Sequence, residues 1–130
     1  MIILTIRTDS PEAEIGLFDG SNKLAYKTWQ AHRQLAETIH EQIKHLLSDQ
    51  KLDWQNIRAI VCYKGPGSFT GLRIGLSVGN ALAYGLNVPI VGTMDEDWIE
   101  TGQALIGSDK DEKIIIPEYG APVNITKPKK

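Results

Sequence analysis

The stretch from residue 57 to residue 86 constrains the fold more than any other part of this chain. Residues 57–63 are an apolar run typical of a buried strand, and residues 69–86 form a long apolar segment of helical length. Between them, Gly65, Pro66 and Gly67 predict a sharp turn, because glycine tolerates unusual backbone angles and proline holds its own φ. Ser68 stands in the N-cap position of the predicted helix. The functional interpretation depends on this strand, turn and helix.

The glycine-rich turn does not match the catalytic and phosphate-binding motifs that it resembles. A Walker A loop needs Lys and then Ser or Thr after its second glycine, whereas Leu72 follows Gly71. A nucleophile elbow places Ser midway between two glycines, where this chain has Phe69. The dinucleotide fingerprint has one residue fewer before its last glycine, and Pro66 lacks an N–H for pyrophosphate. We therefore interpret four residues as a structural turn that positions the helix: Gly65, Pro66, Gly67 and Ser68.

The predicted helix over residues 69–86 is apolar over more than half of its circumference, which is more than one sheet face requires. Its polar side chains share one narrow strip: Arg73, Ser77, Asn80 and Tyr84. Small residues recur at four-residue spacing: Gly71, Gly75, Gly79 and Ala83. Such a row lets another backbone approach closely. That backbone belongs either to the chain's own sheet or to a partner's helix, and we favour the partner.

A second helix, predicted over residues 33–47, is amphipathic in the ordinary way. Its apolar residues occupy one arc: Leu35, Ala36, Ile39, Ile43, Leu46 and Leu47. His40 and His45 resemble a zinc-protease helix motif, but they are five residues apart and point in different directions. We expect solvated histidines and no metal site.

Composition indicates one ordinary globular domain. The chain has 130 residues, 42% of them hydrophobic, and a formal net charge of −2, so tight binding to RNA by this chain alone is not expected. The single cysteine, Cys62, cannot form an internal disulfide, which suits the cytoplasm. No signal peptide and no apolar run of membrane-spanning length is visible. We expect a cytoplasmic protein without a membrane partner.

The order of predicted elements indicates an α/β fold. Strands are predicted at 2–7, 14–18, 23–29, 57–63 and 89–91, with a further short strand at 114–116. A third helix is predicted near 96–106. Three meandering strands followed by helix, strand, helix and strand match one actin-like (ribonuclease H-like, ASKHA) lobe, with helices packed on a mixed five-stranded sheet. We assign residues 1–116 to this lobe and 117–130 to an extended C-terminal tail.

The sequence resembles the TsaB (YeaZ) family. The eleven residues 65–75, read as GPGSFTGLRIG, look like the signature of that family. Residues 3–8 resemble its first strand and turn, residues 31–37 the start of its first helix, and residues 88–92 the strand after its second helix. The resemblance covers about residues 1 to 95 as one continuous lobe.

This resemblance implies a non-catalytic role. Family members belong to the bacterial machinery that makes N6-threonylcarbamoyladenosine (t6A) in tRNA. They pair with a related catalytic subunit, TsaD, and the ATPase TsaE joins the complex. ATP and metal are then expected on the partner, with no cofactor or metal in this chain, and tRNA is reached only through the complex.

The resemblance also implies that the two long helices form the heterodimer contact, and that the same surface makes a homodimer when the partner is missing. Together with the small-residue row, this predicts a partner interface of nine residues: Leu35, Ile39, Phe69, Gly71, Leu72, Gly75, Leu76, Gly79 and Ala83.

The chain departs from the family pattern in two ways. Arg7 stands where the family usually has Asp, and an arginine cannot ligate a cation; Asp9 is displaced by two positions. Typical members also have a second lobe, which we expect to be deleted here after about residue 95, while Pro117, Glu118 and Tyr119 resemble the family's C-terminal Pro-x-Tyr segment.

Two enzymatic alternatives remain open. The strand, turn and helix are also compatible with a nucleotide-binding actin-like or Rossmann-like enzyme, although the Walker lysine and the strand-end carboxylate are missing. A protease would require Ser68 to act with His32, His40 or His45, and no recognisable spacing supports such an arrangement.

Overall fold

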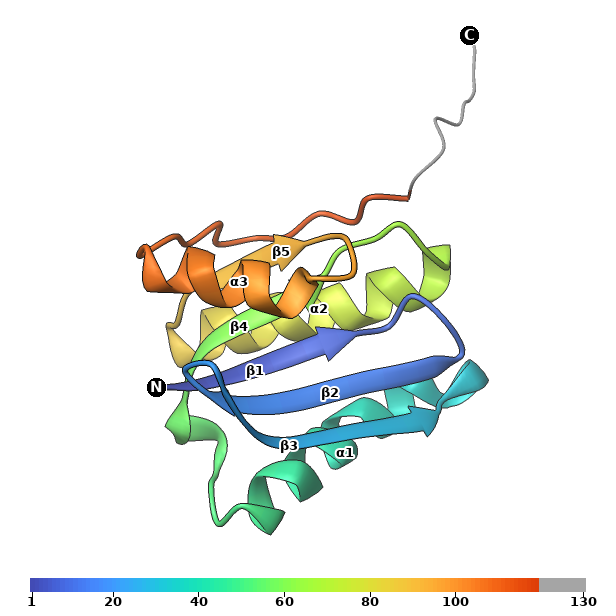
Figure 1. The fold of residues 1–130 in the computed structure, drawn as a ribbon. Helices are drawn as coiled ribbons and strands as arrows, with labels where there is room; N and C mark the ends of the chain where they lie inside the picture. The colour runs from blue at the N-terminus through green and yellow to red at the C-terminus, as the bar shows by residue number, and fades with distance from the viewer. Residues whose placement is uncertain (120–130) are drawn as a thin grey trace, which may run out of the picture.

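The computed structural model describes residues 1–119 as five strands and three α-helices (Figure 1). The strands are β1 (Ile2–Arg7), β2 (Glu12–Asp19), β3 (Asn22–Gln30), β4 (Ile57–Tyr63) and β5 (Ile90–Thr93). The helices are α1 (Leu35–Asp49), α2 (Phe69–Leu86) and α3 (Trp98–Gly107), with short 3₁₀ turns at His32–Gln34 and Trp54–Asn56.

The strands form one mixed sheet in the order β3-β2-β1-β4-β5. The first three strands are antiparallel neighbours, as in a meander, whereas β4 runs parallel to β1 and to β5. Each parallel connection passes through a helix, as parallel strands require. The predicted fold class, a mixed five-stranded sheet of the actin-like or ribonuclease H-like type, is confirmed.

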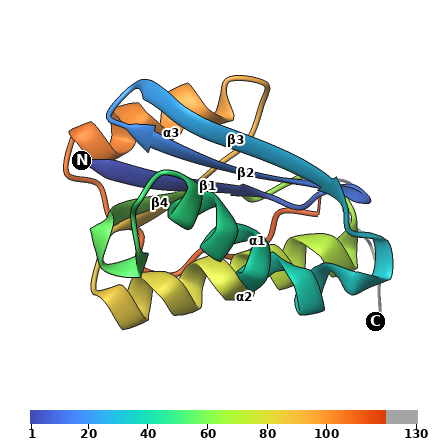
Figure 2. The ribbon, with the colours of Figure 1, turned by 90° about the horizontal axis from the view of Figure 1, so that it is seen from below.

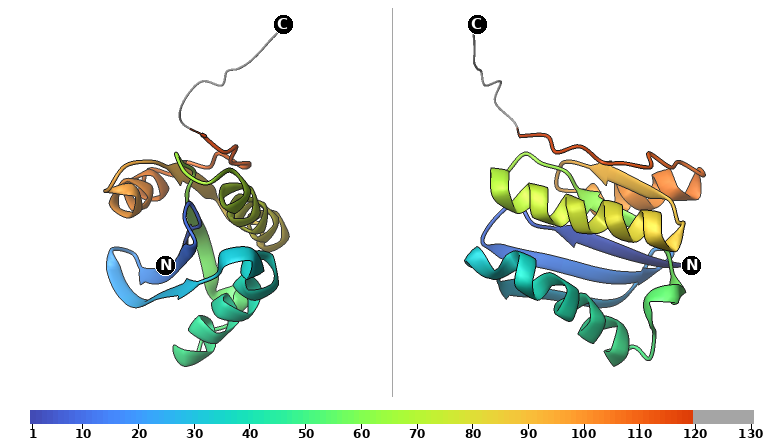
Figure 3. Two further views of the ribbon diagram at one scale, coloured as in Figure 1. Left: turned by 90° about the vertical axis from the view of Figure 1, so that its right-hand side faces the viewer. Right: turned by 180° about the vertical axis from the view of Figure 1, so that it is seen from behind.

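The helices cover the two faces of the sheet unequally. Helices α1 and α2 lie together on one face and α3 on the other, as Figure 2 and both views of Figure 3 show. Alternate residues of β1 supply the two cores: Leu4 and Ile6 face α1 and α2, while Ile3 belongs to the core under Trp98 of α3. This alternation explains why β1 is apolar along almost its whole length.

Most predicted elements lie where the sequence placed them. Helix α2 has the predicted bounds, and the residue after it, Asn87, caps its last turn in a left-handed conformation (φ 57°). Helix α1 begins at Leu35, after a 3₁₀ turn, instead of at residue 33. Ser68 is the N-cap residue of α2, but its side chain makes no capping hydrogen bond.

The strand predicted at 114–116 is wrong. Residues 111–119, which we call the C-terminal strap, run along the outer side of β5 and past α2 without forming a strand. Side chains hold the strap where backbone pairing was expected: Asn80 accepts a hydrogen bond from the Ile115 N–H (2.8 Å) and donates one to the Ile115 carbonyl (3.0 Å). The strap includes residues 117–119 of the predicted tail; residues 120–130 lie outside the described part.

Candidate functional site

The glycine-rich turn connects β4 to α2, and its glycines are required by close contacts. Gly65 has φ 127°, and a Cβ there would collide with the carbonyl of Glu118 in the strap. A Cβ on Gly67 would collide with Asp9. The Ser68 N–H donates a hydrogen bond to the Asp9 carbonyl (2.8 Å), which ties the turn to the end of β1. These contacts describe a structural turn, the interpretation favoured from the sequence.

The small-residue row of α2 packs against the chain's own sheet, and the preference for a partner's helix is wrong. A Cβ on Gly75 would enter the side chain of Thr8, and one on Gly79 would lie 2.6 Å from the Cys62 sulfur. The Thr8 hydroxyl donates a hydrogen bond to the Gly71 carbonyl (2.8 Å). The row therefore brings α2 close to β1 and β4.

Most of the residues predicted to form the partner interface are buried and cannot contact a partner. Seven of its residues lie inside the protein: Leu35, Ile39, Leu72, Gly75, Leu76, Gly79 and Ala83. They face the sheet because an apolar arc buries first against the nearest apolar surface, which here belongs to the same chain. Gly71 is half-buried, and Phe69 is 55% exposed. Only Phe69 among the nine is freely accessible to another protein.

The accessible surface on this side is a groove between the two long helices. It has a volume of about 340 Å³ and is lined by Ala36, Thr70, Arg73, Ile74, Ser77 and Val78. A neighbouring hollow at the start of α2 shares Thr70 and Ile74 with this groove. We call these six residues the α1–α2 groove. The helical wheel identified Arg73 and Ser77 as polar, but Ala36 was assigned to the apolar arc and is exposed.

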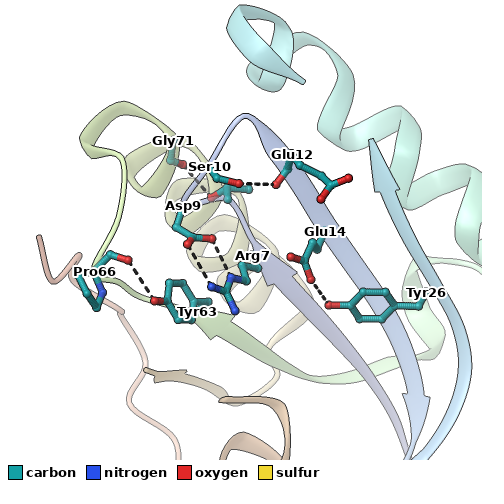
Figure 4. A network of polar contacts seen from close by, with 10 residues as sticks. Arg7, Asp9, Ser10, Glu12, Glu14, Tyr26, Tyr63, Pro66 and Gly71 are labelled. Atoms are coloured by element: carbon teal, nitrogen blue, oxygen red, sulfur yellow. Dashed lines mark hydrogen bonds and ion pairs between the residues drawn. The ribbon is translucent and has the colours of Figure 1, made fainter. Parts of the chain in front are cut away.

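The carboxyl end of β1 carries an internal ion pair (Figure 4). Arg7 donates two hydrogen bonds to Asp9, from Nε to Oδ1 (2.8 Å) and from an Nη atom to Oδ2 (3.2 Å). Its guanidinium also lies over the Tyr63 ring, 4.0 Å from the centroid. The hydrogen bond with Asp9 raises the pKa of Arg7, against the effect of burial, so the guanidinium stays charged.

Neighbouring polar side chains at the same edge of the sheet also have hydrogen-bond partners within the protein. The Tyr63 hydroxyl donates a hydrogen bond to the Pro66 carbonyl (3.1 Å), and burial raises the pKa of Tyr63. The Tyr26 hydroxyl donates one to Glu14 (2.5 Å), and burial followed by this bond raises the pKa of Tyr26. Among the described residues, no cluster of three His, Cys, Asp or Glu side chains could hold a metal ion.

The histidines and the cysteine considered for metal binding or catalysis do not form a site. His45 lies 3.5 Å from Glu41 on the same helix, and the His40 ring packs near Trp54, with 6.3 Å between centroids. Burial raises the pKa of the Cys62 thiol to about 12, so it remains protonated near neutrality. In the described part of the chain, no helix combines the length and the apolar character needed to cross a membrane.

Comparisons with known proteins find the TsaD family model and TsaB relatives. A family model described as "TsaD: tRNA N6-adenosine threonylcarbamoyltransferase" matches residues 29–101. The chain is 31% identical over 97 residues to the tRNA threonylcarbamoyladenosine biosynthesis protein TsaB of Escherichia coli, covering 71% of this chain and 39% of that protein. It is 32% identical to the protein of the same description in Bacillus subtilis, over 69% of this chain and 39% of that protein. The chain thus spans about two fifths of the length of these relatives.

Solved structures share the fold of this chain. YeaZ from Pseudomonas aeruginosa superimposes with a TM-score of 0.67 at 26% sequence identity, covering 72% of this chain and 44% of that chain. RuvC of Thermus thermophilus superimposes with a TM-score of 0.51 at 14% identity, over 82% of this chain and 70% of that chain, and shares the fold alone.

Proposed function

Because this chain belongs to the TsaB (YeaZ) family, we propose that it is a non-catalytic scaffold subunit in the biosynthesis of t6A in tRNA. Its partner is a TsaD-like catalytic subunit, which it binds and activates. ATP and metal belong to the partner, a TsaE-like ATPase joins the assembly in the cytoplasm, and tRNA is reached through the complex.

The α1–α2 groove is the observation that carries this proposal. Ile74 and Val78 remain only half-buried at the groove, whereas the inward-facing residues of α2 are buried: Leu72, Gly75, Leu76, Gly79 and Ala83. Small side chains, Ala36 and Ser77, stand on its two sides and leave room for another helix to approach. A helix laid into such a groove is a common mode of protein recognition.

The strand-end geometry supports a non-catalytic role. The carboxylate of Asp9, the nearest acid to the end of β1, already accepts two hydrogen bonds from Arg7. A metal-bound nucleotide would have to displace that arginine and leave its charge half-buried without a partner, which is costly. Among the residues that the structure describes, no specific contact favours the nucleotide-binding or protease alternatives.

The proposal is tested by mixing this chain with the TsaD-like subunit of its own organism and measuring the mass of the complex by light scattering after size exclusion. A stable heterodimer is expected. Ser77→Arg, which places a long charged side chain in the α1–α2 groove from an exposed position, should weaken binding at least about tenfold, the size of effect typical of a blocked interface centre.

Ala104→Arg is the matched control, because Ala104 is an exposed small residue on α3, across the sheet from the groove. It should bind the partner as the wild type does. If the Ser77→Arg variant folds and binds normally, the groove is not the docking surface; if the wild-type chain does not bind at all, the scaffold role is wrong.

A further inference from the structure

A cluster of exposed aromatic side chains lies at the first turn of α2, where the C-terminal strap crosses it. Phe69 is 55% exposed and Tyr119, from the strap, is 36% exposed. Their rings stack with 4.5 Å between centroids and an interplanar angle of 26°. The Arg73 guanidinium carbon lies 5.3 Å from the centroid of the Phe69 ring. We call Phe69, Arg73 and Tyr119 the aromatic cluster.

The strap is held in this position by the body of the protein. Asn80 binds the backbone of Ile115 through two hydrogen bonds. The Glu118 N–H donates a hydrogen bond to the Lys64 carbonyl (2.7 Å), next to the glycine-rich turn. Tyr119 is thus placed on Phe69 by residues on both sides of the turn, and its ring forms part of a preformed surface.

Arg73 connects this cluster to the α1–α2 groove, since it lines the groove and lies over Phe69. It is the sole charged residue of α2. It is exposed, and no carboxylate among the described residues lies within ion-pair distance of it. An unpaired arginine beside exposed aromatic rings has the composition of an interface hot spot, where Arg and aromatic residues carry most of the binding energy.

We infer that the aromatic cluster is the energetic anchor of the docking surface, and that the strap contributes Tyr119 to it directly. This rests on the proposed function: the occupant is the TsaD-like subunit that binds the α1–α2 groove. The partner is expected to offer an apolar pocket for the two rings and a carboxylate for Arg73, because a cation left unpaired in a dry interface would oppose binding.

Calorimetric titration of the full chain with the TsaD-like subunit of its own organism tests this inference. Tyr119→Ala and Arg73→Gln should each weaken the Kd about tenfold or more. The matched control is Tyr84→Ala, which removes an aromatic ring that is 91% exposed on the same helix. Tyr84 is fifteen residues from Phe69, about 22 Å along the axis, and its variant should bind within about twofold of the wild type. Raising the salt concentration should weaken the wild type more than Arg73→Gln.

The inference is overturned if Tyr119→Ala and Arg73→Gln bind normally while Ser77→Arg does not; the scaffold role would then survive without this anchor. It is also overturned if Tyr119→Ala only dissociates a dimer of this chain and leaves the affinity for the partner unchanged, because the cluster would then bind a second copy. If the wild-type chain does not bind the TsaD-like subunit at all, the proposed function fails together with the anchor. Thermal unfolding of each variant verifies that the fold is intact.

Discussion

Single residues decide how close α2 lies to the sheet. Gly75 provides the space that the buried Thr8 side chain occupies, and Thr8 in turn donates its hydroxyl hydrogen to the Gly71 carbonyl. Gly85, near the other end of the same helix, is open: apart from its chain neighbours and the backbone of its own helix, no heavy atom lies within 4 Å of the position where a Cβ would stand. Gly75 is therefore needed for the close packing of α2 on the sheet, whereas Gly85 is not.

Alanine at these two glycines should have opposite effects on the free energy of unfolding. Gly75→Ala should destabilise the protein by about 1–3 kcal/mol, because the new methyl group overlaps the buried Thr8. Gly85→Ala should stabilise it by up to about 1 kcal/mol, because alanine is the better helix former and the site is open. Denaturant unfolding of both variants measures the difference. A neutral or stabilising Gly75→Ala would mean that α2 shifts easily away from the sheet.

At the scale of elements, the strap replaces a sixth strand. Its carboxylates accept hydrogen bonds from the outer edge of β5: Asp111 from the Ile90 N–H (3.2 Å) and Glu112 from the Gly92 N–H (2.6 Å). The Ile115 side chain packs against Gly92. An open strand edge is a template for unwanted pairing, and the strap covers this one with these side chains and with one backbone hydrogen bond, from the Glu112 N–H to the Ile90 carbonyl (2.9 Å).

This arrangement predicts a dependence of stability on pH. Desolvation acts to raise the pKa of Asp111, but hydrogen bonds from the backbone of Ile90 and Lys113 outweigh it, so its pKa is lowered. The contribution of Asp111 to stability is therefore full above its unfolded pKa and is lost as pH falls through the lower folded pKa. Asp111→Ala should lower the Tm near pH 7, and its difference from the wild type should shrink below about pH 4.

The exposed Glu96 supplies the comparison for Asp111. Glu96→Ala should leave the Tm almost unchanged over the same pH range, since exposed surface substitutions have small effects. A Tm difference between wild type and Asp111→Ala that stays constant from pH 7 to pH 3 would show that the carboxylate charge is not what holds the strap.

At the scale of the whole molecule, the two sides of the sheet differ in the surface that they offer to a partner protein. Helices α1 and α2 leave a groove on one face. On the other face, α3 packs over β4 and β5, with the Trp98 ring edge-on to Tyr63 (6.0 Å between centroids). The exposed Phe69 and Tyr119 both lie at the edge of the α1–α2 side. A partner that binds this chain is therefore expected on the α1–α2 side.

Amide hydrogen exchange along the whole chain tests whether the partner binds on the α1–α2 side. Adding the TsaD-like subunit should slow exchange in α1, in the first turns of α2 and in the strap at 114–119, and should leave α3 unchanged. Slower exchange confined to α3 would place the partner on the opposite face and contradict the assignment of the docking surface.

The local sequence pattern was sufficient to predict most of the secondary structure. The bounds of β4 and α2, the turn between them and the meander of the first three strands follow from apolar periodicity and from Gly and Pro positions, which act within a few residues. The family resemblance came from the same continuous stretch, residues 65–75. Arg7 was also recognisable as unable to ligate a cation, because that property belongs to the side chain itself.

Tertiary structure alone decided which apolar surface each helix covers. A row of small residues such as Gly75 and Gly79 permits a close approach but does not say whose backbone approaches, and Thr8 and Cys62, far away in sequence, fill that space. The position of the strap could not be predicted from local pattern either. It is held by the Asn80 side chain, by the carboxylates at 111–112 and by two isolated backbone hydrogen bonds, and none of these has a periodicity. Sequence thus determined the elements and the family, while long-range packing determined which residues remained exposed for a partner.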